Sequence, residues 1–545
     1  MKAQMDCHGI SHKRVPHSSK LLLDYLDDFA RVRDFYGSGP FDPAGYRTLA
    51  AKLEGFHTHR AAIVEILNRQ NRIFGSGEAA FENIRRLGEA GTFAVVTGQQ
   101  VGLLSGPAFT LYKALTAVKL AQSLSLQGLP CVPVFWLATQ DHDLAEVAQI
   151  ATFDDEYNLV PLHDPGERPA PRSPVGYVKL TENIEVALGD LEKALPPGEP
   201  RERLLRDLRD CYQPGVTWSL AFARWMARLF RPCGVILLDP LDQEVESVTH
   251  PVFARALEES EALRSRLLAR SRALEAAGYH AQVRVTDEST LVFVMRDGNR
   301  LPLQQRAGDF FLDGTEHVSL KELRAGAGQG RFHFSANALL RPVVQDLLLP
   351  TLAYVAGPSE LAYLGQSQTL YESFGRPQPI IFPRAGFTLV DRRIQRLLEK
   401  YKLEVEDVWE SEEHLRQKIA AAGLSEGWAE RFDRSETELA ALLERMRGDI
   451  ETLDPTLLDT LKHAQEKMRY QLEKLKGKLS RAALQRSELL SRHEQALRKS
   501  LNPERDLQER RVGGVSFLGR AGYELLDRIL AQIHTQSSDH QVFVY

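Results

Sequence analysis

FAVVTGQQVGLLSGPAFTLYKALTAVKLAQSL, residues 93–124, is the stretch that decides the fold. An apolar strand over 93–96 leads into a glycine-rich turn, and Pro107 then begins an amphipathic helix. CVPVFWLATQDHDLAEV, residues 131–147, repeats the order of strand, polar turn and helix. Two such units side by side predict an α/β fold with a parallel sheet, and a ligand crevice where the strands end.

The first turn has the composition of an anion-binding loop. Glycines at four-residue spacing let the backbone bend sharply or approach a ligand, and unpaired amides at a helix start attract phosphate or carboxylate. Neither a Walker A motif nor a G-x-G-x-x-G motif is present, and tight packing alone also explains such glycines. The candidate binding residues here are Gly98, Gln99, Gln100, Gly102, Gly106, Thr110 and Lys113.

The second turn carries Asp141, His142 and Asp143 directly after the strand over 133–138. An acid–imidazole–acid sequence at a strand's carboxyl end can orient a general base, hold a divalent cation or bind the amines and hydroxyls of a substrate. The alternative is that Asp143 only caps the following helix. We expect these three residues to be catalytic.

Residues 279–316 consist of short alternating runs separated by polar turns, which predict an antiparallel β-rich insertion within 279–335. A strand over 279–285 would place His280 and Gln282 on one face, from which they could reach a ligand. A hydrogen-bonded structural role is the alternative for this histidine.

A polar block follows the insertion and contributes Asn337, Arg341, Gln345, Tyr354, Gly357, Glu360 and Tyr363 as candidate binding residues. Arg341 lies between Leu340 and Pro342, where a guanidinium needs a partner: a ligand carboxylate or phosphate, or an internal acid such as Glu360 or Asp346. Arg384, after the strand over 380–382, places another cation at a strand end.

The C-terminal third changes character. From residue 391 the sequence is helical and charged, with apolar residues at steps of three and four and a break at Asp454 and Pro455. A helix over 456–501 would be about 69 Å long, so the pair should form an antiparallel coiled-coil arm. A second subunit's arm would bury the remaining apolar stripe, which predicts a homodimer. The expected division is 1–150 (helical N-terminus and first half of the core), 151–230 (mainly helical), 231–390 (second half of the core), 391–502 (arm) and 503–545 (return to the core).

Composition limits the function. The chain of 545 residues has a net charge of −5, which gives no basic footprint for nucleic acid. Its four cysteines show no zinc-type spacing, so no metal site is assigned. Residues 1–17 lack the apolar core of a signal peptide, and the uncharged run over 90–112 is too often broken by polar residues and glycines to span a membrane. A cytoplasmic location is expected.

Five segments resemble successive blocks of the bacillithiol-biosynthesis cysteine-adding enzymes, the BshC family. They are TGQQVGLLSGPAFTLYKAL (97–115), VPVFWLATQDHDLAEV (132–147), LLRPVVQDLLLPTLAYVAGPSELAYLGQ (339–366), IIFPRAGFTLV (380–390) and NPERDLQERRVGGVSFL (502–518). The resemblance implies a Rossmann-like core with inserted connective segments, a coiled-coil arm, and a cytoplasmic enzyme that joins cysteine to glucosaminyl-malate. The family core is also similar to class I aminoacyl-tRNA synthetases, but their His-x-Gly-His motif is absent here, and residues 106–110 occupy its place.

Amide formation from a free carboxylate requires activation. An acyl-adenylate or acyl-phosphate derived from ATP would suit the glycine turn, with Lys113 and Arg341 balancing the phosphate charge. His142, held by Asp141 or Asp143, is the candidate base for the attacking amine. Two other functions stay open: another nucleotide-dependent transferase of the nucleotidylyltransferase type, and a coiled-coil adaptor with a non-catalytic core.

Overall fold

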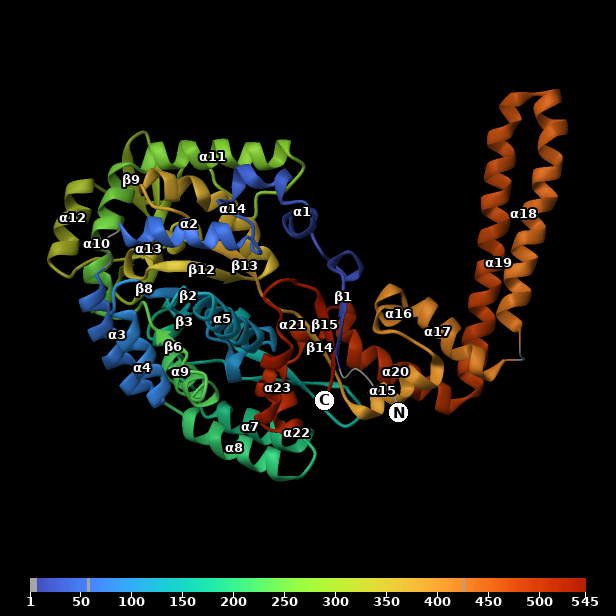
Figure 1. Ribbon diagram of the computed structural model, residues 1–545, viewed down its shortest axis with the longest axis horizontal. Helices are drawn as coiled ribbons and strands as arrows, with labels where there is room; N and C mark the ends of the chain where they lie inside the picture. The colour runs from blue at the N-terminus through green and yellow to red at the C-terminus, as the bar shows by residue number, and fades with distance from the viewer. Residues whose placement is uncertain (1–6, 56–58, 425–426) are drawn as a thin grey trace.

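The computed structural model describes residues 7–55, 59–424 and 427–545. Its centre is a five-stranded sheet, in which all neighbouring strands are parallel (Figure 1). The strand order is β13 (Ile380–Pro383), β12 (Thr351–Ala356), β2 (Phe93–Gln99), β3 (Cys131–Leu137) and β6 (Ile236–Leu238). The two predicted strand–turn–helix units are therefore neighbours, and the α/β prediction is confirmed.

Helices cover both faces of this sheet, and alternate residues of β2 pack into different cores. Ala94 and Val96 pack with α1 (Lys20–Asp27), α3 (Arg60–Phe74), α4 (Glu78–Leu87) and α14 (Pro358–Ser373). Phe93 and Val95 pack with α2 (Pro43–Glu54) and α5 (Phe109–Leu126). The uncharged run thus lies in the interior, as predicted. Among the described residues, no helix has the length and apolar character needed to cross a membrane.

Between β3 and β6 the chain forms a β-hairpin and a group of helices. Their bounds are α6 (Leu144–Val147), β4 (Gln149–Phe153), β5 (Leu159–His163), α7 (Asn183–Ala194), α8 (Glu199–Cys211) and α9 (Trp218–Leu229). This segment is mainly helical after the hairpin, and α9 packs against the same large core as the C-terminal part of the chain.

An antiparallel sheet forms the predicted β-rich insertion. Its order is β10 (Glu316–Val318), β9 (Asp309–Leu312), β8 (Asn299–Arg306), β7 (Ser289–Arg296) and β11 (His333–Ala336), and it packs with α10 (Gln243–Glu258), α11 (Ser260–Ala276), α12 (Leu320–Gly328) and α13 (Arg341–Leu348). The predicted strand over 279–285 is wrong. The backbone N–H and carbonyl of Val283 bond to the side-chain amide of Gln366 on α14, so no neighbouring strand pairs with them.

The C-terminal region leaves the core and returns to it. It runs through β14 (Phe387–Val390), α15 (Arg392–Tyr401), α16 (Val405–Glu410), α17 (Glu412–Ala420), α18 (Trp428–Leu453), α19 (Leu458–Arg486), α20 (Glu488–Leu501), α21 (Gln508–Arg511), α22 (Gly514–Ala521), α23 (Glu524–Gln532) and β15 (His540–Val544). β15 lies between β1 (Cys7–Ile10) and β14, antiparallel to the first and parallel to the second.

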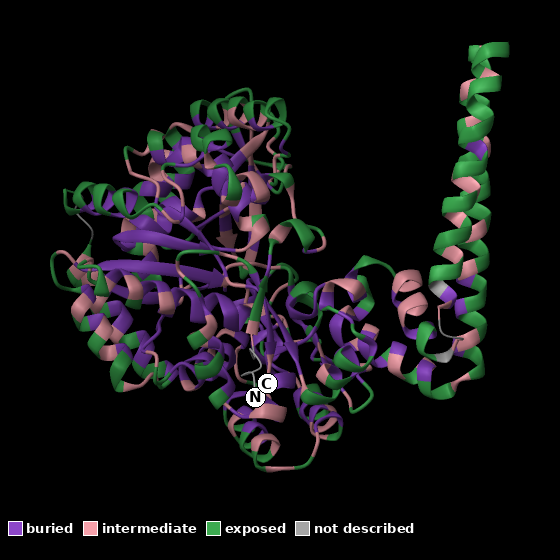
Figure 2. Ribbon diagram, turned by 45° about the vertical axis from the view of Figure 1, so that its right-hand side comes forward, coloured by how far each residue is buried: buried purple, intermediate pink, exposed green. Residues whose placement is uncertain are grey.

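Helices α18 and α19 form the predicted antiparallel arm, which projects far from the core (Figure 1) and is mostly exposed (Figure 2). The predicted uninterrupted helix over 456–501 is wrong. Ser487 has non-helical φ and ψ of −127° and 100°, and its hydroxyl accepts the Leu490 amide to begin α20. The 29 residues of α19 give a helix of about 43 Å.

Candidate active site

A cavity of about 540 Å³ lies at the carboxyl edge of the parallel sheet. Every core strand leads to a residue that lines it: Gln99 from β2, Asp141 after β3, Pro240 after β6, Gly357 after β12 and Arg384 after β13. Along the chain, β3 and β6 are added on one side of β2, and β12 and β13 are added on the other side. The cavity spans this reversal of the strand order, beside β2. Open α/β sheets bind their ligands at such a position.

The structure brings most of the sequence-predicted residues to this cavity. Those that line it are Gly98, Gln99, Gln100, Lys113, Asp141, Asn337, Arg341, Tyr354, Gly357, Glu360, Tyr363 and Arg384. Gly102 and Gly106 line an adjoining cavity of about 620 Å³, which shares five residues with the first. Thr110, His142, Asp143, His280, Gln282 and Gln345 line neither of the two.

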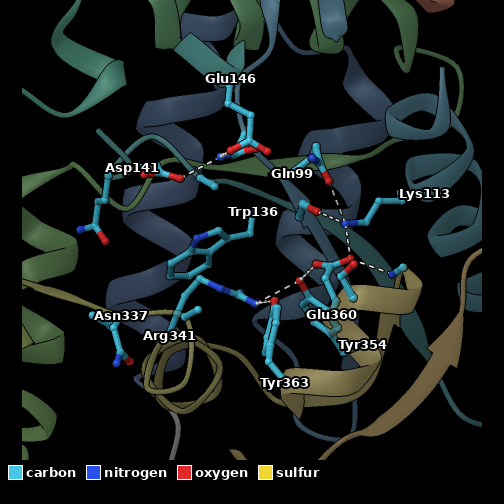
Figure 3. A pocket seen from close by; sticks show the side chains of 18 of the residues that line it. Gln99, Lys113, Trp136, Asp141, Glu146, Asn337, Arg341, Tyr354, Glu360 and Tyr363 are labelled. Atoms are coloured by element: carbon cyan, nitrogen blue, oxygen red, sulfur yellow. Dashed lines mark hydrogen bonds and ion pairs between the residues drawn. The ribbon is translucent and has the colours of Figure 1, made fainter. Parts of the chain in front are cut away.

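Lys113 is held entirely by internal partners. Its ammonium donates to the Gly98 carbonyl, to Gln99 Oε1 at 3.1 Å and to Glu360 Oε2 at 2.5 Å (Figure 3). An ammonium has three hydrogens, so these three acceptors use all of them. Burial lowers the pKa of Lys113, and Glu360 opposes that shift. The geometry gives this lysine no hydrogen for a phosphate.

Arg341 differs from Lys113 because its partners are neutral. Its guanidinium donates to Tyr363 Oη at 2.8 Å, to Tyr354 Oη at 3.2 Å and to Gln345 Oε1 at 3.2 Å. Tyr354 in turn donates to Glu360 Oε1 at 2.8 Å. No described carboxylate lies within ion-pair distance of Arg341, so its charge is available to an anionic ligand. The internal acids that the sequence offered as partners, Glu360 and Asp346, do not pair with it directly.

Arg384 is neutralised from the C-terminal region. Its Nη2 lies 2.6 Å from Glu509 Oε1 on α21, and both side chains are buried, with 8% and 2% exposed. Burial raises the pKa of Glu509, but Arg384 and other donors outweigh it and hold that pKa below its ordinary value. The cation predicted at the end of β13 is present, but it is already paired.

The glycine turn has a close-packed backbone. A Cβ on Gly102 would lie 2.8 Å from the Gly106 Cα, so a side chain there is excluded. The Gly102 and Gly106 amides donate to Gln100 and Leu103 carbonyls, and the Ala108 amide donates to the Val512 carbonyl at 2.8 Å. These amides are therefore not free to bind an anion. The Thr110 hydroxyl is buried without a hydrogen-bond partner in the described chain.

The acidic turn is tied to the glycine turn. Gln100 Nε2 donates to Asp141 Oδ2 and to Glu146 Oε2, both at 2.8 Å. Asp143 accepts the Glu146 amide at 3.3 Å and so caps α6, as the alternative interpretation proposed. The two turns that the sequence placed together do lie together.

His142 follows Asp141 in the chain but does not itself line the cavity. Its Nδ1 is 3.3 Å from Nη1 of Arg300, a residue of β8, and 3.8 Å from Asp141 Oδ1. Burial and the Arg300 charge lower the pKa of His142, while Asp141 and Asp143 raise it by less. Its closest side-chain partner is thus a cation and not the expected carboxylate.

The lining residues that sequence reasoning missed include Trp136, Glu146, Arg300 and Arg510. Trp136 is part of an apolar strand, and Glu146 follows a capping aspartate, so each has an ordinary structural explanation. Arg300 comes from the insertion, whose docking no local pattern reveals. Arg510 lies in a segment dense with charges, and nothing in that composition singles it out.

His280 and Gln282 lie away from the cavity. They are exposed and bond to each other, with His280 Nε2 2.9 Å from Gln282 Oε1. Because 279–285 is not a strand, the face that would have carried both residues toward a ligand does not exist.

One group of possible metal ligands lies outside the cavity, on α16 and α17. Asp407, Glu410 and His414 could each offer one atom to an ion. Lys418 Nζ is 2.6 Å from Asp407 Oδ1 and already pairs with that carboxylate. The cavity itself has no such cluster among the described residues.

Comparison with known proteins identifies relatives along the whole chain. Residues 5–385 match the family described as "Bacillithiol biosynthesis BshC, N-terminal Rossmann-like domain", and residues 387–545 match "Bacillithiol biosynthesis BshC, C-terminal coiled-coil domain". A protein of Koribacter versatilis is 37% identical over 96% of this chain and 97% of its own length. A protein of Solibacter usitatus is 36% identical over 99% and 100%, and one of Salinibacter ruber is 33% identical over 96% and 95%. Each of the three bears the name "Putative cysteine ligase BshC".

Proposed function

Because the chain belongs to the BshC family of bacillithiol biosynthesis, we propose that it is a cysteine ligase of that pathway. The reaction that we propose joins the carboxylate of cysteine to the amine of glucosaminyl-malate and forms an amide. The observation that carries this proposal is the pairing of full-length family membership with a cavity lined both by carboxylates, Asp141 and Glu146, and by arginines without a carboxylate partner in the described chain, Arg341 and Arg510.

The acidic side of the cavity supports binding of an amine. Asp141 and Glu146 share one donor, Gln100, and both line the cavity (Figure 3). Hydrogen bonds to Gln100 and the Arg300 charge outweigh burial and lower the pKa of Asp141, so that carboxylate is ionised at neutral pH. We propose that this side receives the ammonium or amine groups of the substrates.

Two arginines of the cavity support binding of carboxylate or phosphate. Arg341 has neutral partners, and Arg510, which lines both cavities, forms no ion pair within the described chain. A carboxylate can accept two parallel hydrogen bonds from a guanidinium. A substrate that bears both an amine and carboxylates fits a cavity lined in this way.

Activation of the cysteine carboxylate requires a co-substrate, for which we propose ATP. The nucleotide would supply a phosphate leaving group on the acyl carbon. The Gly102, Gly106 and Ala108 amides and the ammonium of Lys113 are used internally, so we assign its phosphates to Arg341 and Arg510. We therefore propose that side chains bind the phosphates, and not the loop amides that the sequence favoured.

In the coupling step the sugar amine attacks the activated acyl carbon. The new C–N bond replaces the bond to the leaving phosphate oxygen, and the amine proton passes to a base on the acidic side. Asp141 and Glu146 line the cavity there, and His142 follows Asp141 in the chain.

A second copy of the chain is the partner that we propose for the arm. Leu442, Met446, Met468, Leu475 and Leu479 are each at least 38% exposed along α18 and α19. Apolar residues that repeat along a coiled coil are normally covered by another helix. A homodimer through the arms would cover them.

Product analysis tests the function. Wild-type protein with cysteine, glucosaminyl-malate and ATP should give the amide, detected by mass spectrometry. Serine in place of cysteine, or glucosamine in place of glucosaminyl-malate, should give less product. Ala338 is exposed and lines the cavity, so Ala338→Trp should fill the site without disturbing the core, while Ala338→Ser is the matched control. Loss of product in the tryptophan variant alone supports the proposal. Absence of product from the wild type, or full activity in the tryptophan variant, would contradict it.

A further inference from the structure

Arg300 enters the cavity from the β-rich insertion and is fixed on three sides. Its Nε donates to Ser335 Oγ at 3.0 Å, its Nη2 donates to the Ala336 carbonyl at 2.9 Å, and its guanidinium carbon lies 3.9 Å from the centre of the Phe293 ring. Only 9% of the side chain is exposed. The remaining nitrogen, Nη1, meets Nδ1 of His142 at 3.3 Å.

This contact determines which nitrogen of His142 bears the proton. A guanidinium has hydrogens on every nitrogen and no lone pair to share, so it can only donate. Nδ1 of His142 must therefore be the acceptor. A neutral imidazole with an acceptor at Nδ1 carries its hydrogen on Nε2.

Burial and the neighbouring cations keep the ring neutral. Burial, Arg300 and Arg168 lower the pKa of His142, while Asp141 and Asp143 raise it by less. Asp141 does not form the usual aspartate–histidine hydrogen bond. Its Oδ1 accepts the backbone amides of His142 and Asp143, and its Oδ2 accepts Gln100.

We infer that Arg300 is a positioning residue that presents His142 as an Nε2–H hydrogen-bond donor and not as a base. In the proposed ligase reaction, on which this role rests, the donor stabilises negative charge that develops on the acyl oxygen. The proton of the attacking amine then passes to a carboxylate of the acidic side, Asp141 or Glu146. No partner for Nε2 occurs within the described chain, and 39% of the side chain is exposed, so the N–H is free to donate to a substrate held beside Asp141 and Arg300, both of which line the cavity.

The state of His142 can be measured without activity. Deuterium exchange at the imidazole Cε1 carbon, read by peptide mass spectrometry across pH, gives the pKa of His142. We expect the wild-type pKa to lie below 6.5, and Arg300→Gln to raise it, because the neighbouring positive charge is removed. Arg300→Lys keeps the charge and should keep the pKa low, and it serves as the second variant if the glutamine variant fails to fold.

Arg296 provides a matched control. It lies on β7 of the same sheet and pairs with Glu316 at the surface, at 2.7 Å. Arg296→Gln should leave the His142 pKa unchanged. An unchanged pKa in Arg300→Gln would overturn the role of Arg300, whether or not the ligase activity is found.

Substitution of His142 separates a donor from a base. Glutamine has an N–H but cannot titrate near neutral pH, so His142→Gln should keep product formation within about 10-fold of wild type, while His142→Ala should lose about 100-fold or more. In Arg300→Gln the acidic limb of the kcat–pH profile should not follow the raised pKa. Equal loss in both His142 variants, or an acidic limb that moves with the His142 pKa, would show that His142 is the base.

Discussion

Ion pairs near the cavity and ion pairs on the arm differ in how far they are buried. Around the cavity, Arg384 and Glu509 form a pair with 8% and 2% of their side chains exposed. On the arm, Arg447 and Glu444 pair at 3.3 Å, with 53% and 66% exposed. A buried charge depends on its partner because water cannot replace it, whereas an exposed charge is solvated with or without one. A paired charge in the core therefore cannot be removed without a large loss of stability, whereas a paired charge on the arm can.

The largest expected effect comes from breaking the buried pair. Glu509→Gln leaves the Arg384 guanidinium buried without a counter-charge and should reduce the free energy of unfolding by about 3–5 kcal/mol. Glu444→Gln on the arm should cost no more than about 1 kcal/mol. Urea denaturation followed by circular dichroism measures both. Equal losses would remove the distinction between the two regions.

Arg341 tests whether an unpaired cavity cation serves a ligand. Arg341→Gln should raise KM for the anionic substrate by about 10- to 100-fold, because a hydrogen bond to a charged group is lost. Arg469→Gln on the exposed arm is the control and should leave KM unchanged. Steady-state kinetics with each substrate varied in turn would show which substrate Arg341 binds. If KM is unchanged for all of them, Arg341 only supports the two tyrosines.

Acid should weaken the core through His540. Burial lowers the pKa of this histidine to about 4, against an ordinary value of 6.5. Between these values the unfolded chain takes up a proton that the folded chain does not, so the free energy of unfolding should fall as pH is lowered through this window. His540→Gln should flatten the dependence between pH 6.5 and pH 4.5. A slope that is the same in both proteins would assign the effect to other groups.

The smallest effect on the stability of the core is expected from a substitution among the exposed apolar residues of the arm. Leu475 is 55% exposed, and Leu475→Glu should convert the proposed dimer to a monomer in analytical ultracentrifugation. The free energy of unfolding of the core should change by no more than about 0.5 kcal/mol. A wild-type protein that sediments as a monomer would contradict the dimer itself.

The sequence predicted the elements that local patterns define. The two strand–turn units, the arm and the position of the cavity follow from glycine spacing and apolar periodicity. Which side chains contact one another across the fold could not be predicted from these patterns. Arg384 and Glu509 are 125 positions apart, and the contact between Arg300 and His142 crosses 158 positions, so no window of sequence contains both members. The helix break at Ser487 was missed because serine has only a weak preference against the helix interior.

The strand before the arm and the last strand of the chain are neighbours, since β14 and β15 pair in parallel. The excursion over 391–539 therefore starts and finishes at one place on the core. The hairpin of α18 and α19 within this segment can gain or lose whole turns, or be exchanged for another hairpin, without shifting the register of any core strand. Selection for assembly and selection for chemistry can act on separate stretches of one gene.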